Sequence, residues 1–215
     1  MSFADITPEV EAALFAPPAH WAALPYGEYQ YKLHPENDRD EYQRIANAFA
    51  NAADPNAKYT IVEITRVQNI EQLIQFEAQK QKLLGIFQAN NVRLPVERRL
   101  WHGTSEECAL DIMRQEFNRS FTNTRHGHDF GEGSYFHVNS TVAASLSDML
   151  PHPMVILSRV LTGRFEKGAR NITQALLQER VESTVDDVNN PSIFAVYHDC
   201  AAYPEYTVKL AFKPA

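Results

Sequence analysis

Leu100-Trp101-His102-Gly103-Thr104 and Gly131-Glu132-Gly133-Ser134-Tyr135-Phe136 are the two stretches that reveal most about this chain. Each joins residues typical of a β-strand to a glycine and to a polar residue that carries a ring. Glycine lets a backbone approach a ligand closely, and the ring offers stacking area with a hydrogen-bonding tip. This combination is typical of a cleft that binds a flat, polar ligand.

Apolar periodicity and capping residues predict the elements around these stretches. A helix that begins at Asp38 is expected, because Tyr42, Ile45, Ala46 and Phe49 fall on one face. The other expected elements are a strand over 59–67, a helix capped by Asn69 and ended by Gly85, a strand over 98–101 leading into a turn at 102–104, a helix capped by Thr104 with Glu107, a strand over 134–138, a helix over about 141–149, and strands over 154–161, 193–198 and 206–212.

The order of these elements favours an α+β fold, because the helices come mostly first and the strands mostly later. A largely antiparallel sheet flanked by helices follows from that order. We find no linker inside residues 38–213, so the sequence predicts a single domain there.

Composition narrows the function classes. The chain has 215 residues with 44% hydrophobic content, which can bury a substantial core, and its net charge of −7 argues against electrostatically driven nucleic-acid binding. Cys108 and Cys200 lie far apart and lack partners at zinc spacing, so two buried, reduced thiols and no metal site are expected. The N-terminus carries acids where a signal peptide carries bases, and no apolar run reaches about 18 residues, so we expect an intracellular protein, cytoplasmic or nuclear.

Motifs along most of the chain resemble the catalytic domain of the poly(ADP-ribose) polymerase superfamily, closest to its mono-ADP-ribosyltransferase branch. They occur in the family's order and cover about residues 18–213. The matching stretches are Pro18-Ala19-His20-Trp21, Ile64-Thr65-Arg66-Val67-Gln68-Asn69, Leu100-Trp101-His102-Gly103-Thr104, Phe117-Asn118-Arg119-Ser120, Gly131-Glu132-Gly133-Ser134-Tyr135-Phe136, Val160-Leu161-Thr162-Gly163, Asp187-Val188-Asn189, Pro191-Ser192-Ile193-Phe194 and Tyr203-Pro204-Glu205-Tyr206.

The resemblance implies one ADP-ribosyltransferase-like domain over residues 18–215, with a split, mostly antiparallel sheet and an N-terminal extension over residues 1–17. It also implies NAD⁺ as co-substrate, no metal, and a protein that accepts ADP-ribose. A nucleic-acid acceptor is the less favoured alternative. The oligomeric state and the target protein are not indicated by the sequence.

The resemblance also implies roles for the residues of the two opening stretches. His102 would hold the adenosine ribose of NAD⁺ with help from Thr104, the Gly103 backbone would pair with the nicotinamide amide, and the Tyr135 ring would stack on nicotinamide. Without the family, His102 is equally a histidine in a capping turn, and Tyr135 a packed residue after a glycine bend. The glycines of 131–133 do not fit a dinucleotide-binding fingerprint, because a strand follows them and the spacing differs.

A loop is expected at Asn118, Arg119 and Ser120, which in the family borders adenine and diphosphate. Arg119 is the best single candidate for a phosphate contact, because a guanidinium forks onto phosphate oxygens. A solvated loop arginine is the alternative.

Ile193 matches the position at which polymer-forming members carry a glutamate. There the glutamate bonds the nicotinamide ribose and prepares the next ADP-ribose hydroxyl. An alkyl side chain cannot accept a proton, so the sequence predicts transfer of a single ADP-ribose by a His102, Tyr135 and Ile193 set.

Departures from the family pattern keep two alternatives open, a catalytically inactive binding module and an NAD⁺ glycohydrolase. Ala143 stands where a serine normally bonds the nicotinamide amide, and Leu146 is nearest to the position of a second stacking aromatic. Ser145 or Ser147 would replace the serine only with a shifted helix register. His137 stands where the family usually has a small residue and is a candidate contributor to an unusual pocket.

Three further groups are interpreted without a catalytic role. Glu205 is a carboxylate between two tyrosines, and we expect it at the end of the sheet, away from the cleft. His126 and His128 lack a third ligand and are expected to be solvated. Asp186 and Asp187 are interpreted as solvated loop charge.

Overall fold

The computed structural model describes residues 16–56, 58–117, 129–147, 153–170, 172–173 and 181–212. The helices are α2 (Arg39–Asn51), α3 (Ile70–Ala89), α4 (Glu106–Gln115), α5 (Ser140–Ser145) and the 3-10 helix η5 (Asp199–Ala201). The strands are β1 (Gln30–Lys32), β2 (Tyr59–Val67), β3 (Glu97–Ser105), β4 (Ser134–His137), β5 (Pro153–Leu161), β6 (Phe165–Lys167), β7 (Ser183–Val185), β8 (Ile193–Val196) and β9 (Ala202–Phe212).

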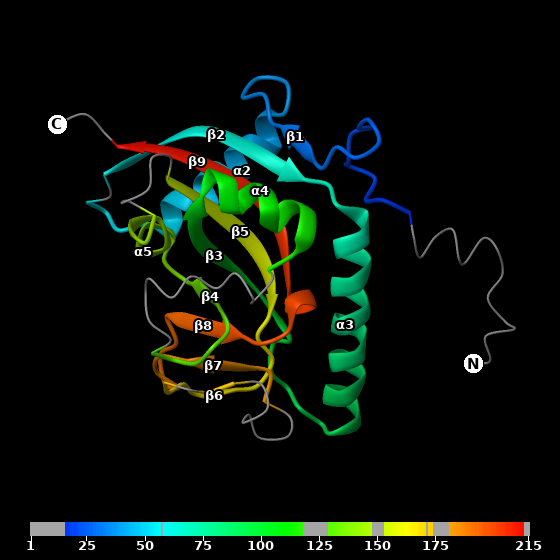
Figure 1. The fold of residues 1–215 in the computed structure, drawn as a ribbon, viewed down its shortest axis with the longest axis vertical. Helices are drawn as coiled ribbons and strands as arrows, with labels where there is room; N and C mark the ends of the chain where they lie inside the picture. The colour runs from blue at the N-terminus through cyan, green and yellow to red at the C-terminus, as the bar shows by residue number, and fades with distance from the viewer. Residues whose placement is uncertain are drawn as a thin grey trace, which may run out of the picture.

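The strands form one nine-stranded sheet in the order β1-β2-β9-β5-β3-β4-β8-β7-β6 (Figure 1). Neighbouring strands run antiparallel, except for the parallel pair β6 and β7. The expected α+β fold with a largely antiparallel sheet is therefore confirmed.

Two hydrophobic cores lie on opposite faces of the sheet, because successive residues of a strand point to opposite sides. In β3, Leu100 belongs to one core and Trp101 to the other. In β5, Ile156 and Val155 divide in the same way. This explains why the strands at the centre of the sheet have near-continuous apolar sequences: both faces are covered.

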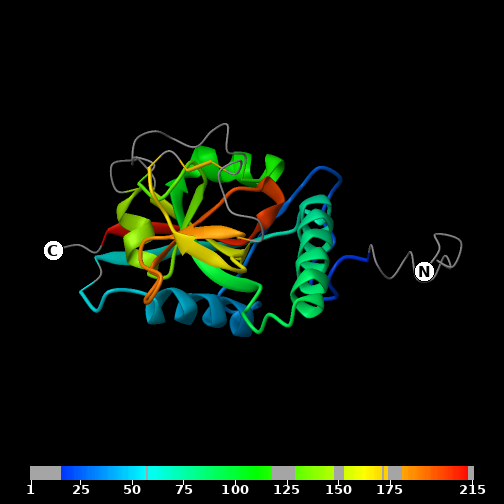
Figure 2. The ribbon, with the colours of Figure 1, turned by 90° about the horizontal axis from the view of Figure 1, so that it is seen from below.

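Helices cover both faces. Figure 2 shows α2 and α4 on opposite sides of the sheet, with α3 standing at one side. Phe76 of α3 and Ala109 of α4 pack in the first core, whereas Phe49 of α2 and Ala143 of α5 pack in the second. The site residues of β3, β4 and β8 therefore sit in a sheet that is held from both sides.

The N-terminus of α3 is where the sequence predicts it, but its C-terminus is not. The Asn69 side chain accepts a hydrogen bond from the Gln72 N–H at 3.2 Å, which confirms the predicted cap. The helix continues past Gly85 to Ala89. A Cβ at Gly85 would meet nothing within 4 Å, and Phe87, beyond the glycine, is buried in the core. Tertiary packing thus overrides the stop signal.

The predicted turn at 102–104 is wrong, because β3 runs through it to Ser105. Pairing with β5 is unbroken from Glu97 opposite Leu161 to Ser105 opposite Pro153, and this long ladder keeps the segment extended. Ser105, not Thr104, caps α4 by accepting the Cys108 N–H at 3.1 Å. A helix does begin directly after the motif, as expected.

The remaining boundaries differ from prediction by short margins. α2 begins after Asp38, but the Asp38 carboxylate accepts the His34 N–H instead of capping the helix. α5 covers Ser140–Ser145 and is capped by Asn139, and β8 ends at Val196. β9 begins at Ala202, earlier than the alternation from Tyr206 indicates.

Candidate functional site

The candidate site lies where β3 and β4 separate. β3 is paired with β5 along its whole length, yet with β4 it shares the single pair Trp101 and His137. β4 pairs fully with β8, from Ser134 opposite Val196 to His137 opposite Ile193. The two predicted motifs therefore flank one gap in the ladder.

The His102 ring closes part of this gap. Its Nδ1 lies 2.8 Å from the Tyr135 carbonyl oxygen, and a carbonyl oxygen can only accept, so Nδ1 carries the proton. Burial lowers the pKa of His102, and the hydrogen bond to Tyr135 only partly offsets that effect. In the resulting neutral ring, Nε2 has a free lone pair with which it can accept a hydrogen bond from a ligand hydroxyl.

Two aromatic rings fix the orientation of that imidazole. The Phe117 ring packs edge-on, with centroids 5.2 Å apart, and the Phe136 ring lies at 5.6 Å. Thr104, on the same face of β3, is buried. The histidine is thus held rigidly and pre-oriented.

Gly103 is required by the close approach of α5. A Cβ at this position would lie 1.7 Å from the carbonyl oxygen of Ala143, a backbone atom that cannot swing away. The helix predicted to carry the family's nicotinamide-binding serine therefore does pack against Gly103. The residue that it presents there is Ala143, which is fully buried.

The two serines considered as replacements are already engaged. The Ser145 hydroxyl donates to the Val142 carbonyl oxygen at 2.8 Å, and the Ser147 hydroxyl donates to the Ala144 carbonyl oxygen at 2.7 Å. Ser147 is also fully buried. Both hydroxyls thus turn back onto the backbone just before them.

Tyr135 is anchored by its hydroxyl. That oxygen accepts the Phe130 N–H at 2.9 Å and donates to the Gly131 carbonyl oxygen at 2.7 Å. Burial raises the pKa of Tyr135 to about 12, so the phenol stays neutral. Because the tip is fixed and the ring is only half-buried, the ring can serve as a stacking surface.

The glycines before Tyr135 have structural roles. Gly131 has a φ of +122°, and a Cβ there would lie 1.9 Å from the Tyr197 hydroxyl oxygen. A Cβ at Gly133 would lie 2.5 Å from the Val196 carbonyl oxygen. They allow the chain to approach β8 and Tyr197, as the glycine-bend interpretation predicts.

Ile193 begins β8 and is held by Asp186. The Asp186 carboxylate accepts N–H groups from Ser192 at 2.9 Å and from Ile193 at 3.0 Å, together with the Ser192 hydroxyl. Burial alone would raise the pKa of Asp186, but these hydrogen bonds lower it overall. Asp186 is partly exposed in the loop before β8, as expected, and its hydrogen bonds to Ser192 and Ile193 give it an additional positioning role that the sequence analysis missed.

His137 is the residue that the sequence analysis named as a candidate contributor to an unusual pocket. It lies opposite Ile193 across the β4–β8 ladder and is 5% exposed. Its Nδ1 has no hydrogen-bond partner among the described residues. A period-two count along β4 puts His137 on the same face as Tyr135, a signal that the sequence did carry.

Glu205 lies outside this region. It is part of β9, which β5 separates from β3, and it forms an ion pair with Arg99, Nε to Oε2 at 2.8 Å. The expectation that it lies away from the cleft agrees with this placement, although Glu205 is within the strand rather than at its end.

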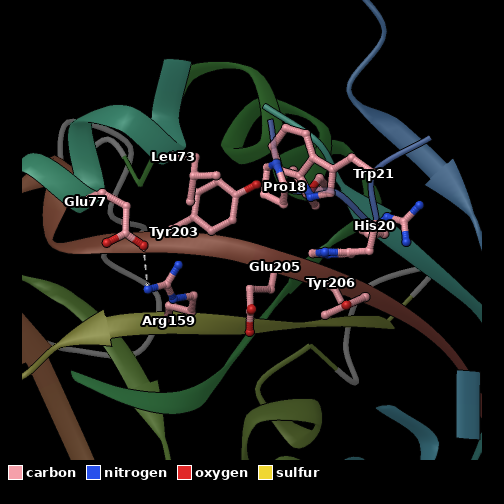
Figure 3. A pocket seen from close by; sticks show the side chains of 11 residues that line it. Pro18, His20, Trp21, Leu73, Glu77, Arg159, Tyr203, Glu205 and Tyr206 are labelled. Carbon is pink, nitrogen blue, oxygen red and sulfur yellow. Dashed lines mark hydrogen bonds and ion pairs between the residues drawn. The ribbon is translucent and has the colours of Figure 1, made fainter. Parts of the chain in front are cut away.

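A pocket does exist near Glu205, between α3, β9 and the segment around Trp21. Figure 3 shows Leu73 and Glu77 from α3, with Tyr203 and Glu205 from β9, around it. Arg159 and Glu77 form an ion pair there at 2.7 Å. The Pro18–Trp21 motif therefore contributes to this pocket and not to the gap between β3 and β4.

Cys108 and Cys200 are free thiols, but Cys108 is exposed and Cys200 is half-buried, so the expectation that both are buried is wrong.

Several other predicted residues lie outside the described part of the chain. Asn118, Arg119 and Ser120, and also His126 and His128, lie in the segment that the structure does not describe. Within the described ranges, no group of three or more His, Cys, Asp or Glu side chains could hold a metal ion. In the same ranges no helix is both long and apolar enough to cross a membrane.

Comparisons with known proteins agree with the resemblance. Residues 39–175 match the profile of the poly(ADP-ribose) polymerase catalytic domain. The chain is similar to protein mono-ADP-ribosyltransferase PARP10 of Mus musculus, at 31% identity over 183 residues, covering 80% of this chain and 18% of the relative. It is 32% identical over 201 residues to protein mono-ADP-ribosyltransferase PARP12 of Homo sapiens, covering 89% of this chain and 27% of the relative.

Coverage is greater for a shorter relative, protein mono-ADP-ribosyltransferase PARP11 of Homo sapiens. That match has 30% identity over 222 residues and covers 89% of this chain and 62% of the relative. The chain therefore spans 18% and 27% of the first two relatives and less than two thirds of this one.

Proposed function

This chain belongs to the family of poly(ADP-ribose) polymerase catalytic domains, and from that premise we propose that it is an NAD⁺-dependent mono-ADP-ribosyltransferase. It would move one ADP-ribose from NAD⁺ to a protein side chain and release nicotinamide. The observation that carries the proposal is the contact between the His102 ring and the Tyr135 carbonyl, which joins the two motifs across one gap in the sheet. The catalytic domain would cover residues 18–215, preceded by an extension over residues 1–17.

In this proposal the chain's residues bind and orient NAD⁺. The acceptor Nε2 of His102 would take a hydrogen bond from a hydroxyl of the adenosine ribose, with Thr104 beside it. The Gly103 backbone, which has no β4 partner, would pair with the nicotinamide amide, and the Tyr135 ring would stack on nicotinamide. Asn118, Arg119 and Ser120 are proposed to border the adenine and diphosphate.

The reaction would break the bond between the nicotinamide nitrogen and the ribose carbon. The bonding pair leaves with nicotinamide, which becomes neutral, and positive charge develops on the ribose. An acceptor carboxylate then forms the new bond to that carbon with no proton to lose, whereas an acceptor hydroxyl would lose its proton to solvent or to a neighbouring group. Holding the reactants in line supplies the rate enhancement.

Single transfer is supported by the side chain at position 193. Ile193 offers no proton acceptor for the hydroxyl of a growing ADP-ribose chain, and the Asp186 carboxylate nearby is committed to Ser192 and Ile193. Elongation would therefore lack a base.

A second candidate, a ligand-binding module without catalysis, is favoured by the environment of α5. Ala143 provides no hydroxyl beside Gly103, and Ser145 and Ser147 are engaged elsewhere. Loss of one hydrogen bond weakens binding by about 1 kcal/mol, which reduces NAD⁺ affinity without abolishing the site.

Labelled NAD⁺ separates these candidates. We expect label on protein without a polymer ladder, and loss of that label in His102→Ala and Tyr135→Ala. His34→Ala and Tyr26→Ala are matched controls at exposed positions and should retain it. Nicotinamide release without protein label would instead identify a glycohydrolase. Binding of NAD⁺ without release would identify the binding module.

The role of position 193 has its own test. Ile193→Glu should yield chains longer than one unit, because it supplies the missing acceptor. A wild-type protein that already makes polymer would refute single transfer.

A further inference from the structure

Four residues share one face of the sheet at the gap. His137 is paired with Ile193 across β4 and β8, and with Trp101 across β3 and β4. Residues two apart along a strand point to the same side, so Tyr135 shares the face of His137, and Gly103 that of Trp101. We call the face formed by Gly103, Tyr135, His137 and Ile193 the gap face.

His137 is the anomalous member of the gap face. It is 5% exposed, and its Nδ1 has no hydrogen-bond partner in the part of the chain that the structure describes. A buried polar atom without a partner costs about 1–3 kcal/mol, and native proteins leave few of them. Such an atom beside a predicted substrate site is accounted for if the substrate supplies the partner.

The groups around His137 leave Nδ1 without a partner. His102 on β3 and Asp186 before β8 are the titratable groups that act on it electrostatically. His102 is occupied by the Tyr135 carbonyl, and Asp186 by Ser192 and Ile193. The helix α5, which packs on the same region, carries the sequence Ser-Thr-Val-Ala-Ala-Ser and no titratable residue.

Burial also determines the protonation state of the His137 ring. Burial, with a smaller effect from His102, lowers the pKa of His137 to about 4 despite the opposing charge of Asp186. The ring is therefore neutral near pH 7, and one nitrogen has a lone pair for a donor. A base this weak accepts a hydrogen bond but does not take a proton from an incoming hydroxyl.

We propose that His137 is a substrate-binding residue whose Nδ1 accepts a hydrogen bond from a hydroxyl of the nicotinamide-bearing ribose of NAD⁺. The inference rests on the proposed function, since it requires NAD⁺ in the site. His137 reaches the gap face from the strand opposite Ile193, so it offers the sugar an acceptor that the alkyl side chain cannot. It orients the ribose for loss of nicotinamide without activating a second ADP-ribose.

The test compares NAD⁺ with analogues that lack the 2′- or the 3′-hydroxyl of the nicotinamide ribose, by calorimetric binding to the full chain. Wild type should bind one analogue about tenfold more weakly than NAD⁺, the loss expected for one hydrogen bond. His137→Phe fills the buried volume without an acceptor and should bind NAD⁺ and that analogue equally. His137→Gln, whose amide oxygen accepts, should restore part of the difference.

Ser158→Ala is the matched control. Ser158 is fully buried and its Oγ also lacks a partner among the described residues, but it lies on β5, two strands from β4. This variant should discriminate as wild type does. His137→Phe that still prefers NAD⁺ over both analogues would overturn the inference.

A measurement on the wild-type protein tests the role of His137 even where a variant does not fold. The ¹⁵N resonance of His137 Nδ1 should move to the position of a hydrogen-bonded acceptor when NAD⁺ is added. Binding without that movement refutes the role of His137 while the proposed function stands. Wild type that binds no NAD⁺ at all refutes the proposed function as well.

Discussion

The gap face and the ion pairs beside α3 differ in whether their polar side chains find partners within the chain. Around the pocket, Arg159 bonds Glu97 through two nitrogens at 2.8 and 2.9 Å and Glu77 at 2.7 Å, while Lys80 lies 2.7 Å from Glu97. We call these four residues the Arg159 network. On the gap face, His137 Nδ1 lacks a partner within the described ranges.

The pKa shifts in the two regions differ in the same way. Burial alone would lower the pKa of Arg159, but its two carboxylate partners raise it, and Arg159 with Lys80 lowers the pKa of Glu97 against the effect of burial. The charges of Arg159 and Glu97 are thus stabilised by the chain itself. The pKa of His137 shows the effect of burial with little compensation. The Arg159 network is therefore completed by the chain's own residues, whereas the gap face combines a buried nitrogen without a partner among the described residues with the interrupted pairing between β3 and β4.

The variant Gly103→Val is expected to have the largest effect, and it tests whether the gap face is the ligand site. The new side chain would collide with the Ala143 carbonyl, so α5 must move and the gap face must open. We expect a loss of about 3 kcal/mol in the free energy of unfolding, the upper range for overpacking, together with loss of NAD⁺ binding. Thermal unfolding and calorimetry measure the two effects.

Gly85→Ala is the matched control, because nothing lies within 4 Å of its Cβ position in the last part of α3, four residues before Ala89. Alanine there should stabilise the protein by about 0.5–1 kcal/mol and leave binding unchanged. If Gly103→Val bound NAD⁺ normally, the gap face would not be the site.

The variant Arg159→Met tests the contribution of the Arg159 network to stability. Removing the guanidinium leaves Glu97 with Lys80 alone and Glu77 without this partner, and we expect a loss of about 2 kcal/mol in denaturant unfolding, because these carboxylates are only partly buried. The KM for NAD⁺ should not change, since Glu97 is at the start of β3, five residues before His102, and Arg159 is on β5, on the side of β3 away from the gap. A changed KM with unchanged stability would reverse the assignment of the two regions.

Arg170→Met is its control. Arg170 pairs with Asp129 at the surface, with side chains 75% and 49% exposed. Such a pair contributes at most about 0.5–1 kcal/mol, so this variant should unfold close to wild type.

The sequence predicts the elements well where local signals and packing agree. β2 has the predicted bounds, and Asn69 caps α3 as expected. Prediction fails where distant contacts override the local signal. α3 continues past Gly85 because Phe87 is needed in the core, and His102 to Thr104 stay extended because β5 pairs with them to the end.

The candidate site also combines features that local sequence patterns predict with features that depend on distant contacts. The motifs name His102, Gly103 and Tyr135, and the fold brings them to one gap. The partnership of His137 with Ile193 depends on the register between β4 and β8, which no local pattern specifies. The hydrogen bonds by which Asp186 holds the entry to β8 depend on the conformation of residues 186–193, which no local sequence pattern specifies.

The last prediction is a pH dependence of stability that is specific to His137. Its ordinary pKa of 6.5 applies in the unfolded chain, and the folded value is about 4, so below pH 6.5 the unfolded state binds a proton that the folded state does not. Stability therefore falls as pH decreases from 6.5 to 4, by about 2–3 kcal/mol for this residue. Denaturant unfolding across that range should show a shallower slope in His137→Phe than in wild type.

His102 serves as the internal comparison, because burial lowers its pKa as well but its Nδ1 is hydrogen-bonded. The wild-type minus His137→Phe difference removes the His102 contribution from the curve. Saturating NAD⁺ should steepen the wild-type curve only as the pH approaches 4 and falls below it, because above that value folded His137 is already neutral and has its lone pair to offer the ribose. A ligand that stabilises wild type and His137→Phe with the same pH dependence would show that the gap face holds its ligand without His137.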